Sequence, residues 1–71
     1  MKAADSNQPQ AGLITERIFD HVLFSSHTKV RLTDGHEYTV SAVDFEAREV
    51  MYYNRNDRPV WVSYKRIAAV L

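Results

Sequence analysis

The spacing of apolar side chains predicts a helix near the start of the chain. Apolar residues recur at helical spacing at Ile14, Ile18 and Val22, and Phe19 and Leu23 widen this stripe. This period predicts an amphipathic helix over about residues 13–24, with its apolar stripe facing a core. Thr15 or Gly12 is expected to cap its N-terminus, because short polar residues and glycine are favoured at that position.

From Thr28 onward the apolar period changes to two, which is typical of half-buried strands. Asp34-Gly35 interrupts this pattern and predicts a tight hairpin, because glycine supplies a positive φ. Lys65-Arg66 predicts a tight corner before the last strand. The third strand carries apolar residues on both faces, so we expect it to be covered on both sides. The five predicted strands are residues 28–32, 37–45, 49–53, 60–64 and 67–71.

The short connections favour antiparallel neighbours, and five strongly twisted strands of this length tend to close into a barrel. The predicted fold class is therefore mainly β, with an N-terminal helix and a small, strongly bent, five-stranded antiparallel barrel of Sm-like or SH3-like type. The last strand, residues 67–71, is almost wholly apolar, so it should pair within the barrel or with another subunit. Residues 1–11 are polar and predict a disordered tail before one domain over 12–71.

Composition argues against catalysis and against metal binding. The chain contains no cysteine, which rules out disulfides, thiolate metal sites and cysteine nucleophiles. His21, His27 and His36 lack the spacing of metal ligands. Gly12 and Gly35 are the only glycines, so there is no glycine-rich phosphate loop. We therefore predict no catalytic residue, no metal, no cofactor and no enzymatic activity.

The sequence also predicts a cytoplasmic location without membrane association. No apolar run approaches the roughly 20 residues that a membrane-spanning helix needs. The N-terminus lacks the basic start and apolar core of a signal peptide. A domain of this size buries only roughly 60% of its unfolded surface, so oligomerisation is a plausible source of added stability.

Charge is balanced overall, with nine Lys and Arg against nine Asp and Glu, but it is unevenly distributed. Residues 34–46 contain four acids and no Lys or Arg, whereas residues 48–66 contain five cations and two acids. The basic stretch also holds aromatic residues, which suits single-stranded nucleic acid because bases stack on flat side chains and cations neutralise phosphates. Cross-strand packing and a solvated surface are the alternative interpretations. The residues concerned are Tyr52, Tyr53, Arg55, Arg58, Trp61, Tyr64, Lys65 and Arg66.

Three short stretches in order form a recognisable pattern over about residues 13–71. They are Val30-Arg31-Leu32-Thr33-Asp34-Gly35, Val43-Asp44-Phe45-Glu46, and Val62-Ser63-Tyr64-Lys65-Arg66 followed by Ile67-Ala68-Ala69-Val70. Their order and spacing resemble the Sm-like family, particularly its bacterial Hfq branch. The third stretch is similar to the family's Tyr-Lys-His motif, with Arg66 where the family has His.

The resemblance implies a homo-oligomeric ring of six or seven subunits, in which the fourth strand of one subunit pairs with the fifth of the next. It also implies binding of single-stranded, U- or A-rich RNA in a regulatory or RNA-chaperone role. The interface residues expected on this basis are Val60, Val62, Tyr64, Ile67 and Val70. The RNA-binding residues expected from the resemblance and from the basic stretch are Tyr64, Lys65, Arg66, Arg55, Arg58 and Arg31.

Small Sm-like barrels also serve as protein-binding modules, including inhibitors of the transcription terminator Rho. The zero net charge and the acidic stretch over residues 34–46 suit this alternative. The partner would then be a protein of the transcription or RNA machinery, and the chain would not bind RNA directly.

Overall fold

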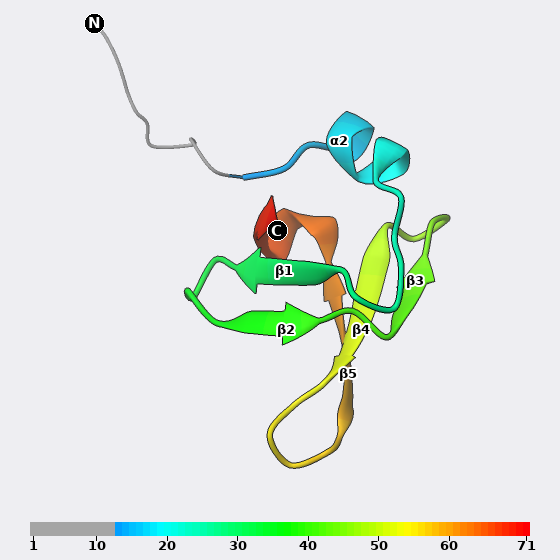
Figure 1. The fold of residues 1–71 in the computed structure, drawn as a ribbon. Coiled ribbons are helices and arrows are strands. Elements are labelled where there is room, and N and C mark those ends of the chain that lie inside the picture. The colour runs from blue at the N-terminus through cyan, green and yellow to red at the C-terminus, as the bar shows by residue number, and fades with distance from the viewer. Residues whose placement is uncertain (1–12) are drawn as a thin grey trace, which may run out of the picture.

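The computed structural model describes residues 13–71, and the predicted tail over residues 1–11 and the alternative cap Gly12 lie outside them. The described chain forms one short helix, then strands interrupted by a single turn of 3-10 helix (Figure 1). The helices are α2 (Glu16–His21) and η1 (Tyr64–Arg66). The strands are β1 (Lys29–Leu32), β2 (Glu37–Thr39), β3 (Ala42–Asp44), β4 (Glu49–Tyr53), β5 (Pro59–Ser63) and β6 (Ile67–Val70).

The strands form two three-stranded antiparallel sheets, which confirms a mainly β fold with a preceding helix. The strand orders are β2-β1-β6 and β3-β4-β5. Within residues 13–71 the two sheets are not joined by strand pairing into one closed sheet. Gly35 has a φ of +91° in the turn between β1 and β2, so the predicted Asp34-Gly35 hairpin is confirmed.

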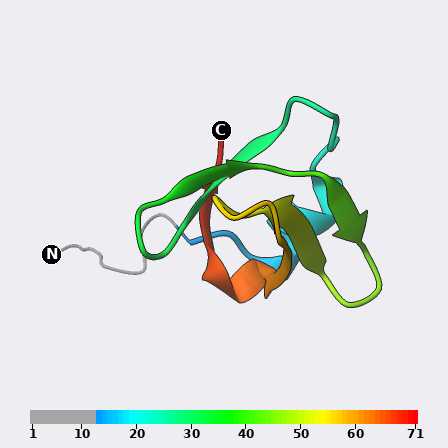
Figure 2. The same ribbon diagram turned by 90° about the horizontal axis from the view of Figure 1, so that it is seen from below.

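The single strand predicted over residues 37–45 is wrong, because the chain bends at Val40 and Ser41 and divides it into β2 and β3. The N–H of Val40 donates to the carbonyl of Thr28 at 2.8 Å, which lies directly before β1. The N–H of Ser41 donates to the carbonyl of Met51 in β4 at 2.7 Å. Consecutive residues therefore bond to different sheets, and Figure 2 shows the chain passing from one sheet to the other here.

One hydrophobic core lies between the two sheets and under the helix. Tyr38 of β2 and Tyr52 of β4 stack with ring centroids 3.9 Å apart, which ties the first sheet to the second. Burial of this apolar surface is the main force holding so small a domain together. The fully or almost fully buried side chains are Phe19, Val30, Leu32, Val40, Val50, Tyr52 and Ile67.

The predicted helix is much shorter than expected, although its cap is confirmed. The Thr15 hydroxyl accepts the N–H of Ile18 at 3.1 Å, and the chain is extended again at Val22. The predicted apolar stripe is confirmed at Phe19, which is fully buried, but is wrong at Ile18 and Leu23, which are 49% and 93% exposed. A helix of six residues makes fewer than two turns, so it directs only one side chain squarely at the sheets.

The expectation that β4 is covered on both faces is also wrong. Val50 and Tyr52 face the core, whereas Tyr53 on the opposite face is 52% exposed.

The predicted corner at Lys65-Arg66 is confirmed as η1, whose single turn is capped by Ser63. No helix within residues 13–71 is long and apolar enough to cross a membrane.

Candidate nucleic-acid interface

Strand alternation divides the aromatic and basic residues of the sequence into separate places. Tyr52 lies in the core, and the Tyr64 ring lies 6.4 Å from that of buried Phe19. These two tyrosines therefore have packing roles. Tyr53 and Trp61, by contrast, are about half exposed on the outer face of β4 and β5. The predicted residues thus divide between the η1 corner and the far end of the β4–β5 hairpin.

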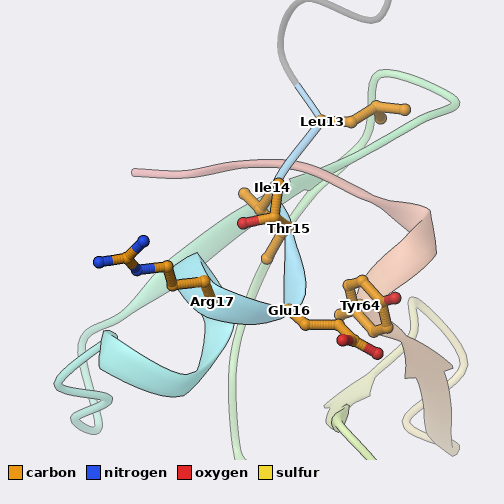
Figure 3. A pocket seen from close by; sticks show the side chains of 6 residues that line it. All are labelled: Leu13, Ile14, Thr15, Glu16, Arg17 and Tyr64. Atoms are coloured by element: carbon orange, nitrogen blue, oxygen red, sulfur yellow. The ribbon is translucent and has the colours of Figure 1, made fainter.

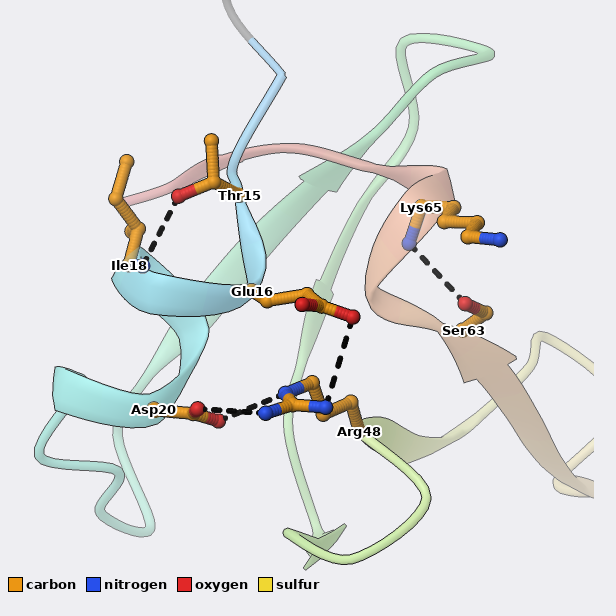
Figure 4. A network of polar contacts seen from close by, with 7 residues as sticks. All are labelled: Thr15, Glu16, Ile18, Asp20, Arg48, Ser63 and Lys65. Atoms are coloured by element: carbon orange, nitrogen blue, oxygen red, sulfur yellow. Dashed lines mark hydrogen bonds and ion pairs between the residues drawn. The ribbon is translucent and has the colours of Figure 1, made fainter.

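The η1 corner is held in place by backbone hydrogen bonds on both sides. The N–H of Tyr64 donates to the Arg48 carbonyl at 2.9 Å, and the N–H of Thr33 donates to the Arg66 carbonyl at 2.9 Å. The Ser63 hydroxyl accepts the N–H of Lys65 at 3.2 Å (Figure 4). These bonds fix the backbone of the corner. The Lys65 side chain is exposed and lies apart from the ion pairs of Arg48 (Figure 4).

Arg66 and Arg31 are less available for phosphate than Lys65, because acids lie near both. Arg31 donates from Nε to Glu37 at 3.2 Å across the β1–β2 pair. Hydrogen bonds from the His36 backbone and side chain hold the pKa of the Asp34 carboxyl below its usual value, and the charge of Arg66 adds a smaller effect. Among the residues described, Lys65 forms no ion pair.

Arg48 is committed to holding the helix on the second sheet. Its guanidinium donates to both carboxylate oxygens of Asp20, at 3.0 and 2.9 Å, and its Nη1 lies 3.6 Å from Glu16 Oε2 (Figure 4). This pairing lowers the pKa of Asp20 and raises that of Arg48. Arg48 also has a φ of 54°, a conformation that non-glycine residues adopt rarely. Arg48 is therefore a structural residue of the basic stretch.

An open hollow lies beside the start of α2, with the Tyr64 ring as one wall (Figure 3). The Glu16 carboxylate lies next to this ring, while the Arg17 side chain points away from it (Figure 3). The apolar lining of the hollow comes from Leu13 and Ile14. A carboxylate beside the aromatic wall repels phosphate, so the hollow does not suit RNA.

At the other end of the hairpin the turn is shaped by one amide side chain. The Asn54 Oδ1 accepts the N–H groups of Asn56 and Arg58 at 2.8 and 3.0 Å. The N–H of Asn54 also donates to the Arg58 carbonyl at 2.9 Å. Asp57 takes the left-handed conformation of the turn, with a φ of 60°. The side chains of Arg55 and Arg58 form no hydrogen bond or ion pair within residues 13–71.

The predicted interface residues lie on the strands that border the open edges of the two sheets. Within residues 13–71 β5 pairs only with β4 and β6 only with β1, so each has one edge without a strand partner, although the Ile67 carbonyl of β6 accepts the N–H of Ile14 at 3.3 Å. Ile67 is fully buried in its own core, so its side chain is not available to a neighbour. The remaining predicted residues are partly buried against the core: Val60, Val62, Tyr64 and Val70.

The pairing register reveals what the sequence alone left open. Alternation indicates that Tyr52 and Tyr53 face opposite ways, but only the packing of Tyr52 against Tyr38 of the other sheet shows which one is outside. Within residues 13–71 no group of three or more His, Asp or Glu side chains is arranged to hold a metal ion.

Comparison with models of known protein families, with curated proteins and with solved structures found no match to this chain.

Proposed function

We propose that the chain is an Sm-like protein that forms a ring and binds single-stranded RNA in a regulatory or RNA-chaperone role. The observation that carries this proposal is the arrangement around η1. The exposed Lys65 and Arg66 lie between β5 and β6, and each of these strands has an unpaired edge. Pairing of β5 in one subunit with β6 in the next would repeat this basic corner around a ring.

The strand arrangement supports a small barrel as the subunit of this ring. If β2 and β3 are treated as one bent strand, the chain has five strands, and all of them share one core. Stacking of Tyr38 on Tyr52 brings the two halves of this core together. Ring closure would give hydrogen-bond partners to the backbone groups along the edges of β5 and β6, which are otherwise exposed to unwanted strand pairing.

The first test measures the mass of the assembly and its affinity for RNA. Native mass spectrometry is expected to give five to seven subunits, with six as the reference case. Fluorescence anisotropy with labelled oligo-U and oligo-A is expected to show binding that weakens steeply as salt is raised. A monomer that binds neither RNA at low salt would contradict the proposal.

The corner variants locate the binding. Lys65→Ala combined with Arg66→Ala is expected to weaken RNA binding and to lower the salt dependence by about 0.7 per lost phosphate contact. Arg17→Ala is the matched control, since it removes one exposed cation from the helix and its side chain points away from Tyr64 (Figure 3). An equal effect of both variants would indicate general electrostatics rather than a site at η1.

A protein-interaction module is the second candidate function, and one observation favours it. Asp44 and Glu49 lie directly opposite each other on β3 and β4, and Glu46 lies in the turn between them. Adjacent carboxylates repel phosphate and suit a basic protein surface. Capture of partners from ribonuclease-treated extract, with no RNA binding by the pure chain, would favour this candidate.

A further inference from the structure

The outer face of the β4–β5 hairpin carries two exposed aromatic side chains. Met51 is paired directly with Trp61, and Tyr53 is paired directly with Pro59, so these four side chains share one face of the sheet. Trp61 is 49% exposed and Tyr53 is 52% exposed. The two rings are diagonal neighbours on the pleat, within reach of one ligand.

Neither ring is used for packing against another ring in the described part of the chain. The ring contacts found there join residues of the core and of the β1–β2 hairpin, and they include neither Tyr53 nor Trp61. Their exposure therefore leaves two flat surfaces open to solvent. Flat, exposed rings on a strand surface are what successive nucleic-acid bases use for stacking.

The charges around this face select the kind of ligand. Arg55 and Arg58 lie with Asp57 in the turn that joins Tyr53 to Pro59, and hydrogen bonds between Asn54 and the turn backbone hold it together. The side chains of the two arginines thus have no part in holding the turn. The acids within the strands of this sheet, Asp44 and Glu49, pair at the end away from the turn. With Arg55 and Arg58 against Asp57, the turn next to Tyr53 keeps a net positive charge, as a polyanion requires.

We infer that this surface, formed by Met51, Tyr53, Trp61, Arg55 and Arg58 and named here the hairpin platform, binds single-stranded RNA by base stacking. The inference rests on the proposed function and adds a second contact region to it. β5 begins at the platform and ends at Ser63 before η1, so the two regions lie at opposite ends of one strand. Stacking tolerates any base, so the platform adds affinity rather than sequence specificity.

Tryptophan fluorescence tests the platform directly, because Trp61 is the only tryptophan in the chain. Titration with oligo-A RNA is expected to quench its emission with the same midpoint as the anisotropy of the labelled oligomer. Anisotropy reports RNA bound anywhere, whereas quenching reports RNA at the platform. Binding without quenching would overturn the platform and leave the proposed function intact; absence of any binding would overturn both.

Substitutions of Trp61 and Tyr53 show whether RNA bases stack on these rings or whether RNA bound elsewhere changes the Trp61 emission indirectly. Trp61→Ala is expected to weaken RNA binding about 10-fold, whereas Trp61→Phe keeps a stacking ring and should retain most of the affinity. Tyr53→Ala should weaken binding while leaving Trp61 as the probe. Leu23→Ala, which truncates a side chain that is 93% exposed elsewhere, is the control and should leave affinity unchanged.

The arginines of the turn provide the third measurement. Arg55→Ala and Arg58→Ala are each expected to reduce the salt dependence of binding by about 0.7, the contribution of one phosphate contact in a single strand. If Trp61→Ala and Tyr53→Ala bind RNA as tightly as the unchanged chain, the platform is not a binding surface. Quenching by a captured protein, with none by RNA, would likewise overturn the inference.

Discussion

At the end of the β4–β5 hairpin next to the helix, Arg48 donates to the Asp20 carboxylate, forms an ion pair with Glu16 and fixes α2 against the sheet. At the far end, Arg55 and Arg58 have no acidic partner among residues 13–71, and Asn54 shapes the turn instead. Arginine therefore stabilises the fold at one end of the hairpin, whereas at the other end its side chains remain available to bind a ligand. The difference lies in what surrounds each guanidinium, which a count of charges cannot show.

The aromatic residues differ between the two ends in the same way. Near the helix, the rings of Phe24 and Phe45 pack on buried Phe19 at 5.4 and 5.7 Å, although Phe45 is itself 52% exposed. At the far end, Tyr53 and Trp61 are half exposed. Mutations near the helix should therefore change stability most, and mutations at the platform should change binding most.

Phe19→Ala is expected to have the largest effect, because Phe19 is fully buried and carries the helix's whole contact with the core. Loss of such a side chain costs about 3–5 kcal/mol, comparable with the total stability of a domain this small. Urea denaturation followed by circular dichroism measures the change. Ile18→Ala, at a 49% exposed position of the same helix, should have little effect. Equal effects of the two variants would mean that the helix does not close the core.

Asn54→Ala is expected to have the next largest effect and tests how the far end is built. The substitution removes the acceptor for two backbone N–H groups, at about 1 kcal/mol each. Asn54→Asp keeps an acceptor oxygen and should recover much of the loss. Asn56→Ala is the matched control, because its side chain makes no hydrogen bond in the described residues. RNA binding should fall in Asn54→Ala if the turn positions the platform.

Local signals in the sequence predicted local features of the fold well. The Thr15 cap, the Asp34-Gly35 turn and the corner at Lys65-Arg66 each depend on a few neighbouring residues, and the structure confirms all three. The bend at Val40 and Ser41 has no comparable signal. It arises because their N–H groups find partners in two different sheets, and that choice depends on how the whole chain packs.

The candidate site was predicted only in part for a similar reason. Composition identified an aromatic and basic stretch, but it could not separate Tyr52 from Tyr53. These residues differ only in which side of β4 they occupy, and the core decides the side through the stack of Tyr52 on Tyr38. The role of Arg48 was likewise missed, since its partner Asp20 lies 28 residues earlier in the chain.

Two variants at Arg48 separate its side-chain contacts from its backbone strain. Arg48→Ala loses the contacts with Asp20 and Glu16 and keeps the unfavourable φ of 54°. Arg48→Gly loses the same contacts but accepts a positive φ freely. The glycine variant should therefore be the more stable of the two, by about 1 kcal/mol in urea denaturation. A less stable glycine variant would show that unfolded-chain entropy outweighs the strain.

The pH dependence of stability gives the smallest expected effect, and its sign follows from Asp20. The hydrogen bond from Arg48 lowers the pKa of Asp20 in the folded chain, so the unfolded chain binds this proton more tightly. The ion pair therefore contributes fully above the usual aspartate pKa of about 3.9, and its contribution is lost as the pH falls through the lower folded value. Urea midpoints measured between neutral and acidic pH should fall toward acid.

Asp20→Asn should remove part of this acid-induced loss but not all of it. The pKa of Asp34 is lowered too, by its hydrogen bonds from His36, so a second carboxylate adds a slope of the same sign. Arg48→Ala should remove the same part as Asp20→Asn, and the two together should remove no more, because both variants break the Arg48–Asp20 pair that lowers the Asp20 pKa. Additive effects would mean that Arg48 and Asp20 act separately. The charges at the helix end of the hairpin would then, like Arg55 and Arg58 at the far end, form no ion pair that stabilises the fold.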